Sequence, residues 1–455
     1  MKCLAIDIGA ESGRGIEGWI QDGKLEIREV GRFPNQTRTI GDSLRWDIDA
    51  LASHVFSCVA ASAEGLTSVG IDTWAVDFVL LDYLGQLLEP PFHYRDSRTD
   101  GMMDEVFKII PRRAIYEISG IQFLPFNTLF QLYSMSRDMS PALEHACSFL
   151  TIPDYLSHLL LGSARRLTCE FTNATTTQCM TWKTGKWSGH LLRKLGIPTN
   201  IFPDIVASGT LLGSMPSGVK VIAPACHDTG SAVAAVPAVG DDFAWISSGT
   251  WSVMGVEVPS AVVTDESYES NFTNEGGVGG TYRLSKNVMG LWLLQQCRST
   301  WAEAGREYSY EELVSLAAKS AGVLFDVDED EFLKIGDMPK RIVARIGGSV
   351  DGVGFIVRSI LESLADKYRI VLWQLEGLVG GRLNRIHIIG GGSQNRLLNQ
   401  LTANACGRPV VAGPVEATAV GNLMVQMVAL GEIGSIGEAR EMIKRSFPVE
   451  VFEPV

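Results

Sequence analysis

The feature that most constrains the fold is a pattern of apolar segments and glycine-rich turns that occurs twice along the chain. At the start, an apolar run over residues 3–8 meets a cluster of glycines, and an Asp-Gly turn joins two strand-like segments within residues 16–30. Such a turn between apolar segments is typical of a β-hairpin. Residues 242–256 and 280–284 repeat this alternation of strand and turn. We therefore expect two similar halves, each opening with a β-meander.

Helices are expected to follow each meander. The clearest covers residues 353–378, whose apolar side chains keep the spacing of one helical face. The pattern predicts further helices over residues 49–63, 287–304 and 417–430, and one that is capped by Ser393. Residues 90–210 are expected to be rich in loops, with helical patches only over 141–146 and 154–161. This alternation predicts an α/β fold of two domains that meet near residues 235–241.

The composition is that of a folded protein. Of 455 residues, 46% are hydrophobic and 20% charged, which excludes a disordered chain and leaves room for two large domains. The net charge of −13 lacks the basic character of a nucleic-acid or anionic-membrane binder, and no run of about 18 apolar residues occurs. We expect neither nucleic acid nor a membrane among the partners.

The cysteines and the N-terminus indicate a cellular location. The eight cysteines are scattered and none forms a Cys-x-x-Cys motif, which favours a reduced, cytoplasmic protein. Asp7 comes too early for a secretory signal peptide. Histidine, cysteine and acidic residues show no metal-cage spacing, so we expect no structural zinc.

The first glycine cluster, residues 7–14, directly follows the first expected strand. Glycines beside small residues let successive backbone N–H groups point at one anion, as in a phosphate-binding nest. Arg14 would add a charge-assisted donor, and Asp7 would supply a carboxylate for Mg²⁺, usually through water. A hairpin turn without any ligand is the alternative interpretation of the same residues.

Three other glycine or serine motifs are excluded. The phosphate-binding Gly-x-x-x-x-Gly-Lys-Ser/Thr motif and the Gly-x-Ser-x-Gly motif of serine hydrolases are absent. Residues 13–18 match Gly-x-Gly-x-x-Gly, but a strand and a hairpin turn follow where the dinucleotide fingerprint needs a helix. The first cluster is therefore interpreted as a hairpin loop.

Two further loops support phosphate binding. Residues 247–251 lie between two expected strands at the start of the second half, so two hairpin loops could face each other and hold the phosphates from both sides. Residues 390–395 join a strand to a helix N-terminus, where backbone N–H groups and the helix dipole favour an anion.

Asp228 is the candidate general base. It lies between His227 and Thr229, after a buried strand and before the expected domain boundary. Phosphoryl transfer needs a carboxylate that accepts the proton of the attacking hydroxyl, and an ordinary Asp, with a pKa of about 3.9, is ionised at neutral pH. The alternative is that Asp228 only caps a helix. The catalytic interpretation depends on the phosphate loops.

Three segments combine polar and aromatic side chains in the way that a polyol site requires. They are residues 70–78, 91–100 and 122–128. Amides, carboxylates and histidine can bind hydroxyl groups, and an aromatic ring can cover the apolar face of a sugar. Taken one at a time, each segment could equally be a solvated loop with packed aromatic residues.

Together, the segments around Asp7, Asp228, Thr250 and Gly391 resemble the carbohydrate kinases of the FGGY type, within the sugar kinase and actin superfamily. The resemblance runs essentially end to end. The segments that resemble the branch of the family acting on L-rhamnulose are residues 70–78, 93–98, 120–128, 172–178, 274–277, 286–295 and 412–418.

This resemblance implies two RNase-H-like (actin-like ATPase) domains, each a mixed sheet flanked by helices, around a central cleft. Residues 1–238 would bind sugar and phosphate, and residues 239–455 the nucleotide. The reaction implied is the ATP- and Mg²⁺-dependent phosphorylation of L-rhamnulose on its 1-hydroxyl, by a monomer or a homodimer. Asp228 would match the proton acceptor, and Asp7 and Asp228 would bind Mg²⁺, mostly through water.

The resemblance also implies two sets of contact residues. The nucleotide contacts would be Ala10, Glu11, Ser12, Gly13, Arg14, Thr250, Gln295 and Gly391. The sugar contacts would be Ala75, His227, Asp228, Thr229 and Asn287. Ala75 and Gly230 depart from the family pattern, which has Gly and Ala there, and the added methyl group at 75 could crowd the sugar. The alternatives are another ketose (L-fuculose, L-xylulose or D-xylulose) or a non-catalytic ATP-binding sensor.

Overall fold

The computed structural model describes residues 1–162, 167–238, 240, 242–334, 336–349 and 352–455. Within them the chain forms two units. Unit 1 consists of Met1–Pro237, Glu257–Leu284 and Thr418–Ser446, and unit 2 consists of Ala238–Val256, Ser285–Ala417 and Phe447–Val455. The division into domains 1–238 and 239–455 stays a prediction, because two later segments of the chain belong to unit 1.

Unit 1 is built on a six-stranded sheet with the strand order β13-β14-β6-β1-β2-β3. The strands are β1 (Lys2–Ile8), β2 (Ser12–Gln21), β3 (Lys24–Pro34), β6 (Leu66–Thr73), β13 (Leu211–Ser214) and β14 (Lys220–Ile222). The predicted hairpin is confirmed, because Gln21 pairs with Lys24 across a turn in which Asp22 and Gly23 have positive φ. β6 lies parallel to β1, and β14 lies parallel to β6.

Residues 90–210 hold more helix than predicted, because the two expected patches, 141–146 and 154–161, belong to a series of short helices in the described part of this segment. These are α2 (Met102–Ile109), α3 (Arg112–Ser119), α4 (Thr128–Arg137), α5 (Pro141–Glu144), α6 (Ile152–Leu161), α7 (Phe171–Thr176) and α8 (Gly189–Lys194). Their lengths of four to ten residues are below the window in which helical periodicity can be recognised.

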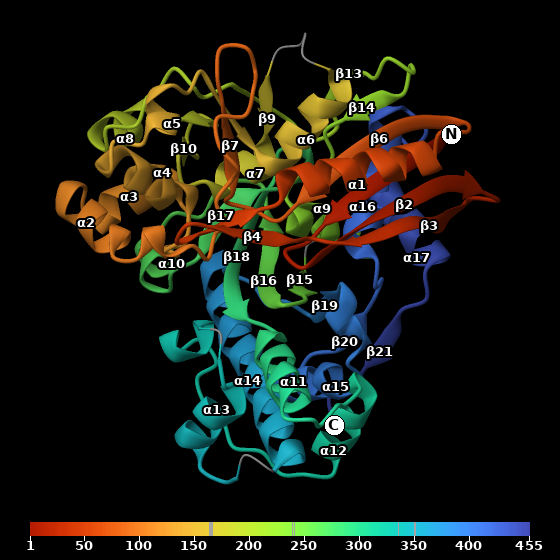
Figure 1. Cartoon of the computed structure of the whole chain (residues 1–455). Helices are drawn as coiled ribbons and strands as arrows, with labels where there is room; N and C mark the ends of the chain where they lie inside the picture. The colour runs from red at the N-terminus through yellow and green to blue at the C-terminus, as the bar shows by residue number, and fades with distance from the viewer. Residues whose placement is uncertain (163–166, 239, 241, 335, 350–351) are drawn as a thin grey trace. The chain divides into compact units, whose positions relative to one another are not determined.

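The other elements of unit 1 complete its layers. They are β4 (Thr37–Ile40), β5 (Ser43–Trp46), α1 (Ile48–Ala61), β7 (Phe78–Leu81), β8 (Ser148–Thr151), β9 (Thr168–Glu170), β10 (Met180–Thr181), β11 (Lys186–Trp187), β12 (Asp204–Val206), α9 (Asp228–Ala234), α10 (Asp265–Glu269), β17 (Thr273–Gly276), nearly all of α16 (Ala417–Ala429) and α17 (Ile436–Ser446). Figure 1 shows α16 and α17, in blue, beside the red N-terminal strands from the opposite end of the chain.

Glycines on β2 allow helices to pack closely on both faces of this sheet. A Cβ added to Gly15 would lie 2.9 Å from Sγ of Cys58 in α1. Gly18, three positions along the strand, faces the other side, where an added Cβ would lie 2.6 Å from Cδ1 of Leu423 in α16. The Gly-x-Gly-x-x-Gly spacing therefore serves packing, in agreement with its exclusion as a dinucleotide motif.

Unit 2 contains most of a second, seven-stranded sheet with the order β17-β18-β16-β15-β19-β20-β21. Its remaining strands are β15 (Phe243–Ser248), β16 (Trp251–Val258), β18 (Tyr282–Met289), β19 (Arg385–Ile389), β20 (Val410–Ala412) and β21 (Glu450–Phe452). The predicted long helix is confirmed as α14 (Val353–Val379), and it contacts α11 (Trp292–Glu303), α12 (Tyr310–Ala318), α13 (Met338–Ile346) and α15 (Arg396–Cys406) (Figure 1). None of the helices in the described ranges combines the length and apolar character that a membrane span requires.

Two helices of unit 2 begin later than predicted. The helix expected from residue 287 begins at Trp292, because residues up to Met289 continue strand β18. The predicted cap Ser393 instead lies within a 3₁₀ turn over Gly391–Gln394. Asn395 is the actual cap of α15, and its side chain accepts a hydrogen bond from the backbone N–H of Leu398 at 3.1 Å.

Candidate active site

Two acidic side chains lie side by side where β1 and β6 run parallel. Asp7 and Asp72 are register partners, and Arg14 faces Asp7 from the antiparallel strand β2. Arg14 donates hydrogen bonds from Nε and Nη2 to Oδ2 of Asp7, at 2.9 and 2.7 Å. Asp72 is fully buried, and its Oδ2 accepts a hydrogen bond from Nδ2 of Asn422 on α16 at 2.6 Å.

Asp228 joins these two residues to form what we call the carboxylate cluster (Asp7, Asp72 and Asp228). Burial and the charge of Asp7 raise the pKa of Asp72 well above its ordinary value, against the hydrogen bond from Asn422. The pKa of Asp228 is raised by burial and by Asp7, while His227 opposes this rise. The charge of Asp7 therefore acts on both of the other carboxyl groups.

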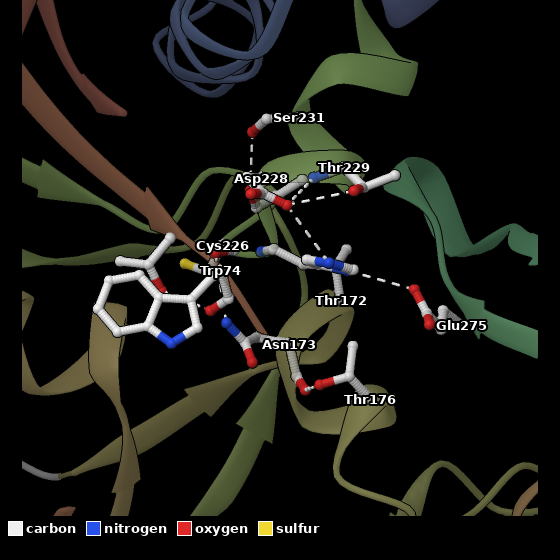
Figure 2. A network of polar contacts seen from close by, with 12 residues as sticks. Trp74, Thr172, Asn173, Thr176, Cys226, Asp228, Thr229, Ser231 and Glu275 are labelled. Carbon is white, nitrogen blue, oxygen red and sulfur yellow. Dashed lines mark hydrogen bonds and ion pairs between the residues drawn. The ribbon is translucent and has the colours of Figure 1, made fainter. Parts of the chain in front are cut away.

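The backbone beside β6 places Asp228. His227 forms a parallel bridge with Thr73 at the end of this strand, and Asp228 then begins α9. The Oδ1 atom of Asp228 accepts hydrogen bonds from N and Oγ1 of Thr229 at 2.5 and 3.2 Å, and Nε2 of His227 lies 3.4 Å from it (Figure 2). All three contacts use Oδ1, and 29% of the Asp228 side chain remains exposed.

A buried glutamate organises the backbone on which this aspartate lies. The Oε2 atom of Glu170 accepts hydrogen bonds from N and Oγ1 of Thr172, at 2.9 and 2.6 Å, and from N of Cys226 at 3.0 Å. Oγ1 of Thr172 in turn accepts a hydrogen bond from N of His227 at 3.1 Å. Figure 2 shows Thr172 and Cys226 beside Asp228 in this network.

A buried ion pair lies behind His227. Nη2 of Arg283 lies 2.9 Å from Nδ1 of His227 and 3.1 Å from Oε2 of Glu275, and Nε of Arg283 donates to the carbonyl of Gly276 at 2.8 Å. Burial would raise the pKa of Glu275, but the charge of Arg283 opposes it, and the pKa is lowered. Arg283 is completely buried.

The loop after β6 carries the predicted sugar contact Ala75, which is half-buried. Its neighbour Val76 has φ of +69°, a left-handed conformation that is strained for a β-branched residue. Oγ1 of Thr128 donates a hydrogen bond to the carbonyl of Val76 at 2.6 Å, and N of Trp74 donates to the carbonyl of Ile8 at 3.1 Å. The fold thus imposes this conformation from both sides.

Asp77 links two of the three predicted polar segments, residues 70–78 and 91–100, with Trp46 and Gln131. Its carboxylate accepts hydrogen bonds from the indole N–H groups of Trp46 and Trp74, from the backbone N–H of Tyr94 and from Nε2 of Gln131, at 2.6 to 3.1 Å. Burial raises the pKa of Asp77 to about 6, against these donors. Because four protein groups already use its oxygens, Asp77 holds the loop rather than offering free acceptors.

The first predicted phosphate loop is short and fixed by backbone hydrogen bonds. N of Gly9 donates to the carbonyl of Ser12 at 2.9 Å, and N of Asn35 donates to the carbonyl of Glu11 at 3.0 Å. Glu11 and Ser12 are exposed and Ala10 is half-buried.

The second predicted phosphate loop, residues 247–251 of unit 2, is called the glycine-lined loop below. The carbonyls of Gly249 and Thr250 accept hydrogen bonds from N of Leu291 and N of Trp292, at 3.0 and 3.1 Å. The loop therefore sits against the first turn of α11, where Gln295 lies. Thr250 and Gln295, both predicted nucleotide contacts, belong to this one local structure.

Most glycines around the glycine-lined loop serve its packing. A Cβ added to Gly392 would lie 2.0 Å from Oγ of Ser248, and one added to Gly390 would lie 3.1 Å from the Ser248 carbonyl oxygen. A Cβ added to Gly290 would lie 2.5 Å from the carbonyl carbon of Trp251. Gly391 differs, because nothing lies within 4 Å of its Cβ position. It is the predicted contact that leaves room for a ligand.

Comparison with known proteins identifies the family. Residues 2–226 match the N-terminal domain and residues 244–430 the C-terminal domain of the FGGY family of carbohydrate kinases. A rhamnulokinase of Bacteroides thetaiotaomicron is 44% identical, over 99% of this chain and 95% of the relative, and one of Bacillus subtilis is 38% identical, over 100% and 96%. The chain belongs to the FGGY family of carbohydrate kinases.

The solved structures that this kinase resembles establish the same fold. Glycerol kinase of Plasmodium falciparum with ADP superposes with a TM-score of 0.81 at 14% identity, covering 100% of this chain and 94% of that one. A xylulose kinase of Lactobacillus acidophilus gives a TM-score of 0.79 at 15% identity, with the same coverage. The predicted α/β class with two sheet-containing, actin-like ATPase domains is confirmed, and the protein is a sugar kinase.

The structure groups the predicted site residues of this kinase within each unit. In unit 1, Arg14 pairs with Asp7, and His227 and Thr229 contact Asp228. In unit 2, Thr250, Gln295 and Gly391 lie in or beside the elements that pack around the glycine-lined loop. Asn287 lies on strand β18 rather than on the predicted helix, and its role stays a prediction.

Several residues of this kinase site were missed by sequence reasoning. Asp72 lay in a segment assigned to sugar binding, and Arg283, Glu275 and Asn422 were assigned no role in the site. A charged or amide side chain inside an otherwise apolar strand or helix is the signal that could have indicated them. Within the described ranges, no group of three or more His, Cys, Asp or Glu side chains could hold a metal ion by itself.

Proposed function

We propose that this sugar kinase transfers the γ-phosphoryl group of ATP to the 1-hydroxyl of L-rhamnulose. The observation that carries the choice of sugar is the 38–44% identity, over nearly the full length, to relatives named rhamnulokinase. The geometry alone would suit several ketoses, because a carboxylate can accept a proton from any primary alcohol. The relatives therefore support the choice of substrate, and the site geometry supports the chemistry.

Asp228 is the proposed general base. Thr229 and His227 hold its Oδ1 atom, which leaves Oδ2 to accept the hydroxyl proton as the oxygen attacks the γ-phosphorus. A carboxylate that is fixed through one oxygen keeps its other oxygen oriented toward the substrate. No side-chain entropy is then lost in reaching the reactive orientation. His227 and Thr229 are themselves proposed sugar contacts, together with Ala75 and Asn287.

The nucleotide contacts are proposed on both units. They are Ala10, Glu11, Ser12, Gly13 and Arg14 of unit 1 and Thr250, Gln295 and Gly391 of unit 2. Arg14 would place its guanidinium near the phosphates while Asp7 holds two of its N–H groups. The open space above Gly391 would admit the nucleotide to the backbone.

The carboxylate cluster suits Mg²⁺ bound together with ATP. Asp7 and Asp228 offer the hard oxygen ligands that this ion prefers, and the ion usually keeps several waters. This agrees with the lack, in the described part of the chain, of a side-chain cluster able to hold a metal alone. When bound with ATP, Mg²⁺ neutralises phosphate charge. Asp7 and Asp228 would orient its waters.

Ala75 bears on which ketose is accepted. A methyl group at this position could crowd the sugar, so L-fuculose, L-xylulose and D-xylulose remain the competing substrates. The Ala75→Gly variant should bind L-rhamnulose at least as well as the unmodified enzyme. A larger gain for one of the other ketoses would identify that sugar as the one the methyl group excludes.

The deciding experiment is ADP release measured in a coupled assay with the four ketoses at equal concentration. The proposal expects the highest kcat/KM for L-rhamnulose and loss of activity when EDTA removes Mg²⁺. A higher value for another ketose would reassign the substrate. If none of the four sugars stimulated ADP release, the ATP-binding sensor would be favoured.

A cytoplasmic location belongs to the proposal and is supported by eight free cysteines. Light scattering would separate a monomer from a homodimer.

A further inference from the structure

Arg283 contacts His227 from the side opposite to the proposed base. It is wholly buried on β18, and its Nη2 atom lies 2.9 Å from Nδ1 of His227. A guanidinium carries only donors, and it stays protonated in proteins. Nδ1 must therefore present its lone pair to Arg283 for this 2.9 Å contact to be a hydrogen bond.

The consequence concerns the other ring nitrogen. A neutral imidazole carries one N–H group, so a lone pair on Nδ1 places the hydrogen on Nε2. Nε2 lies 3.4 Å from Oδ1 of Asp228, so a hydrogen on Nε2 would face a carboxylate acceptor. The opposite tautomer would bring two donors together at Arg283 and a lone pair to the carboxylate of Asp228.

We infer that Arg283 is a positioning residue for phosphoryl transfer, because it fixes His227 in the Nε2–H tautomer that holds Oδ1 of Asp228. This inference rests on the proposed role of Asp228 as base. It extends that role, because it explains how a residue outside the substrate contacts keeps Oδ2 of the base oriented toward the hydroxyl.

Glu275 stabilises the buried guanidinium of Arg283. It could also accept a hydrogen bond from His227, which is the arrangement that competes with our inference. Its Oε2 atom lies 3.1 Å from Nη2 of Arg283, which provides the counter-charge that a buried cation requires. The same atom lies 3.2 Å from Nδ1 of His227. If His227 instead carried its hydrogen on Nδ1 and donated it to Glu275, Arg283 would have no part in setting the tautomer.

Nitrogen NMR of the intact enzyme distinguishes the two arrangements directly. The chain has 7 histidines, and ¹⁵N-histidine labelling with a His227→Gln sample assigns the signal of residue 227. We expect an unprotonated Nδ1 and a protonated Nε2 in the unmodified enzyme. An Nδ1–H signal for His227 would overturn the inference, whatever the kinetics show.

Kinetics test the consequence for turnover. The pair Arg283→Met with Glu275→Gln removes the guanidinium without leaving a buried charge unpaired. We expect kcat to fall about 10- to 100-fold, the range typical for partners that orient a functional side chain, while KM for ATP changes less than about threefold. Arg283→Lys, which keeps a donor facing Nδ1, should recover part of kcat. A folded double variant with unchanged kcat would contradict the inference.

A matched control uses another arginine near α9. Arg440 forms an ion pair with Glu257 at 2.5 Å and donates to the carbonyl of Val233 at 3.0 Å. Arg440→Met with Glu257→Gln removes an ion pair of the same residue types that contacts α9 at Val233 and should leave kcat unchanged. Asp228→Asn separates the two proposals. If that variant keeps its turnover, the assignment of Asp228 as base fails. The NMR measurement tests the tautomer of His227 independently of that result.

Discussion

The carboxylate cluster of unit 1 and the glycine-lined loop of unit 2 present their functional groups in opposite ways. In unit 1, charged side chains carry the chemistry, and other side chains hold them: Arg14 holds Asp7, Asn422 holds Asp72, and Thr229 holds Asp228. In unit 2, the backbone itself is presented, and small residues let it pack tightly.

Each region is vulnerable to a different kind of substitution. A site made of side chains fails when a functional atom is removed, even if the fold is unchanged. A site made of backbone fails when a side-chain atom is added to a glycine, because the surrounding atoms are close-packed and leave no space for it.

The largest effect should come from removing one charged atom in unit 1. Asp228→Asn keeps the size of the side chain but removes the proton acceptor, so kcat should fall roughly 10² to 10⁴-fold. Calorimetric titration should show that ATP still binds, because the proposed nucleotide contacts are residues other than Asp228. Near-normal turnover in this variant would refute Asp228 as the base.

The next effect should come from adding one methyl group in unit 2. In Gly392→Ala the new Cβ would meet Ser248 at 2.0 Å, so the loop must shift. We expect a loss of about 2 to 3 kcal/mol in the free energy of unfolding, as for overpacked cores, and a higher KM for ATP.

Gly391→Ala is the neighbouring control for that variant. Nothing lies within 4 Å of its Cβ position, so stability should stay within about 0.5 kcal/mol. KM for ATP should nevertheless rise, because the methyl group would fill the space proposed for the nucleotide. An unchanged KM would remove Gly391 from the proposed contacts.

A smaller effect should appear in the pH dependence of stability, through the buried acid Asp154 near the carboxylate cluster. Asp154 accepts hydrogen bonds from Oγ1 of Thr151 and from N of Glu170 at 3.1 Å, and burial with the charge of Glu170 raises its pKa to about 7. The native state therefore binds a proton more tightly than the unfolded chain, whose Asp pKa is about 3.9. The stability from this group is present below about pH 4 and is lost as pH rises through 7.

Asp154→Asn should remove this loss. At pH 8 the variant should be about 2 kcal/mol more stable than the unmodified protein, less than the full linkage value because Asn bonds Thr151 more weakly. Urea unfolding at pH 5 and pH 8 measures it. Asp138→Asn is the control with the opposite sign, because Arg137 lowers the pKa of this exposed group. A gain for Asp154→Asn at pH 5 equal to that at pH 8 would contradict the assignment.

The smallest effect concerns backbone strain in unit 1. Val76 has φ of +69°, where glycine is favoured over any residue with a Cβ. Val76→Gly should therefore be about 1 kcal/mol more stable than Val76→Ala, the reverse of the usual order. Both variants lose the two γ-methyl groups of Val76, so the comparison removes that part of the lost burial. Equal stability, or the usual order, in thermal unfolding would show that the loop relaxes and stores no strain.

The sequence predicted local structure well where neighbours in the chain decide it. The hairpin through Asp22 and Gly23 and the long helix α14 follow from turn chemistry and periodicity, and both are confirmed. Among the short helices of residues 90–210, those near 141–146 and 154–161 were predicted and the others were missed, since packing against distant residues stabilises helices that are too short to show a pattern.

The sequence alone also determined the family, the candidate base Asp228 and the loops that suit phosphates, because these depend on short runs of residues. Tertiary structure decided what surrounds them: that Asp72 lies beside Asp7, that Arg283 reaches His227, and that Gly392 packs on Ser248 while Gly391 stays open. Such pairs join residues from different strands, helices and loops. Their contacts form only when the sheets and helices assemble. The spacing of residues along the sequence therefore does not predict these contacts.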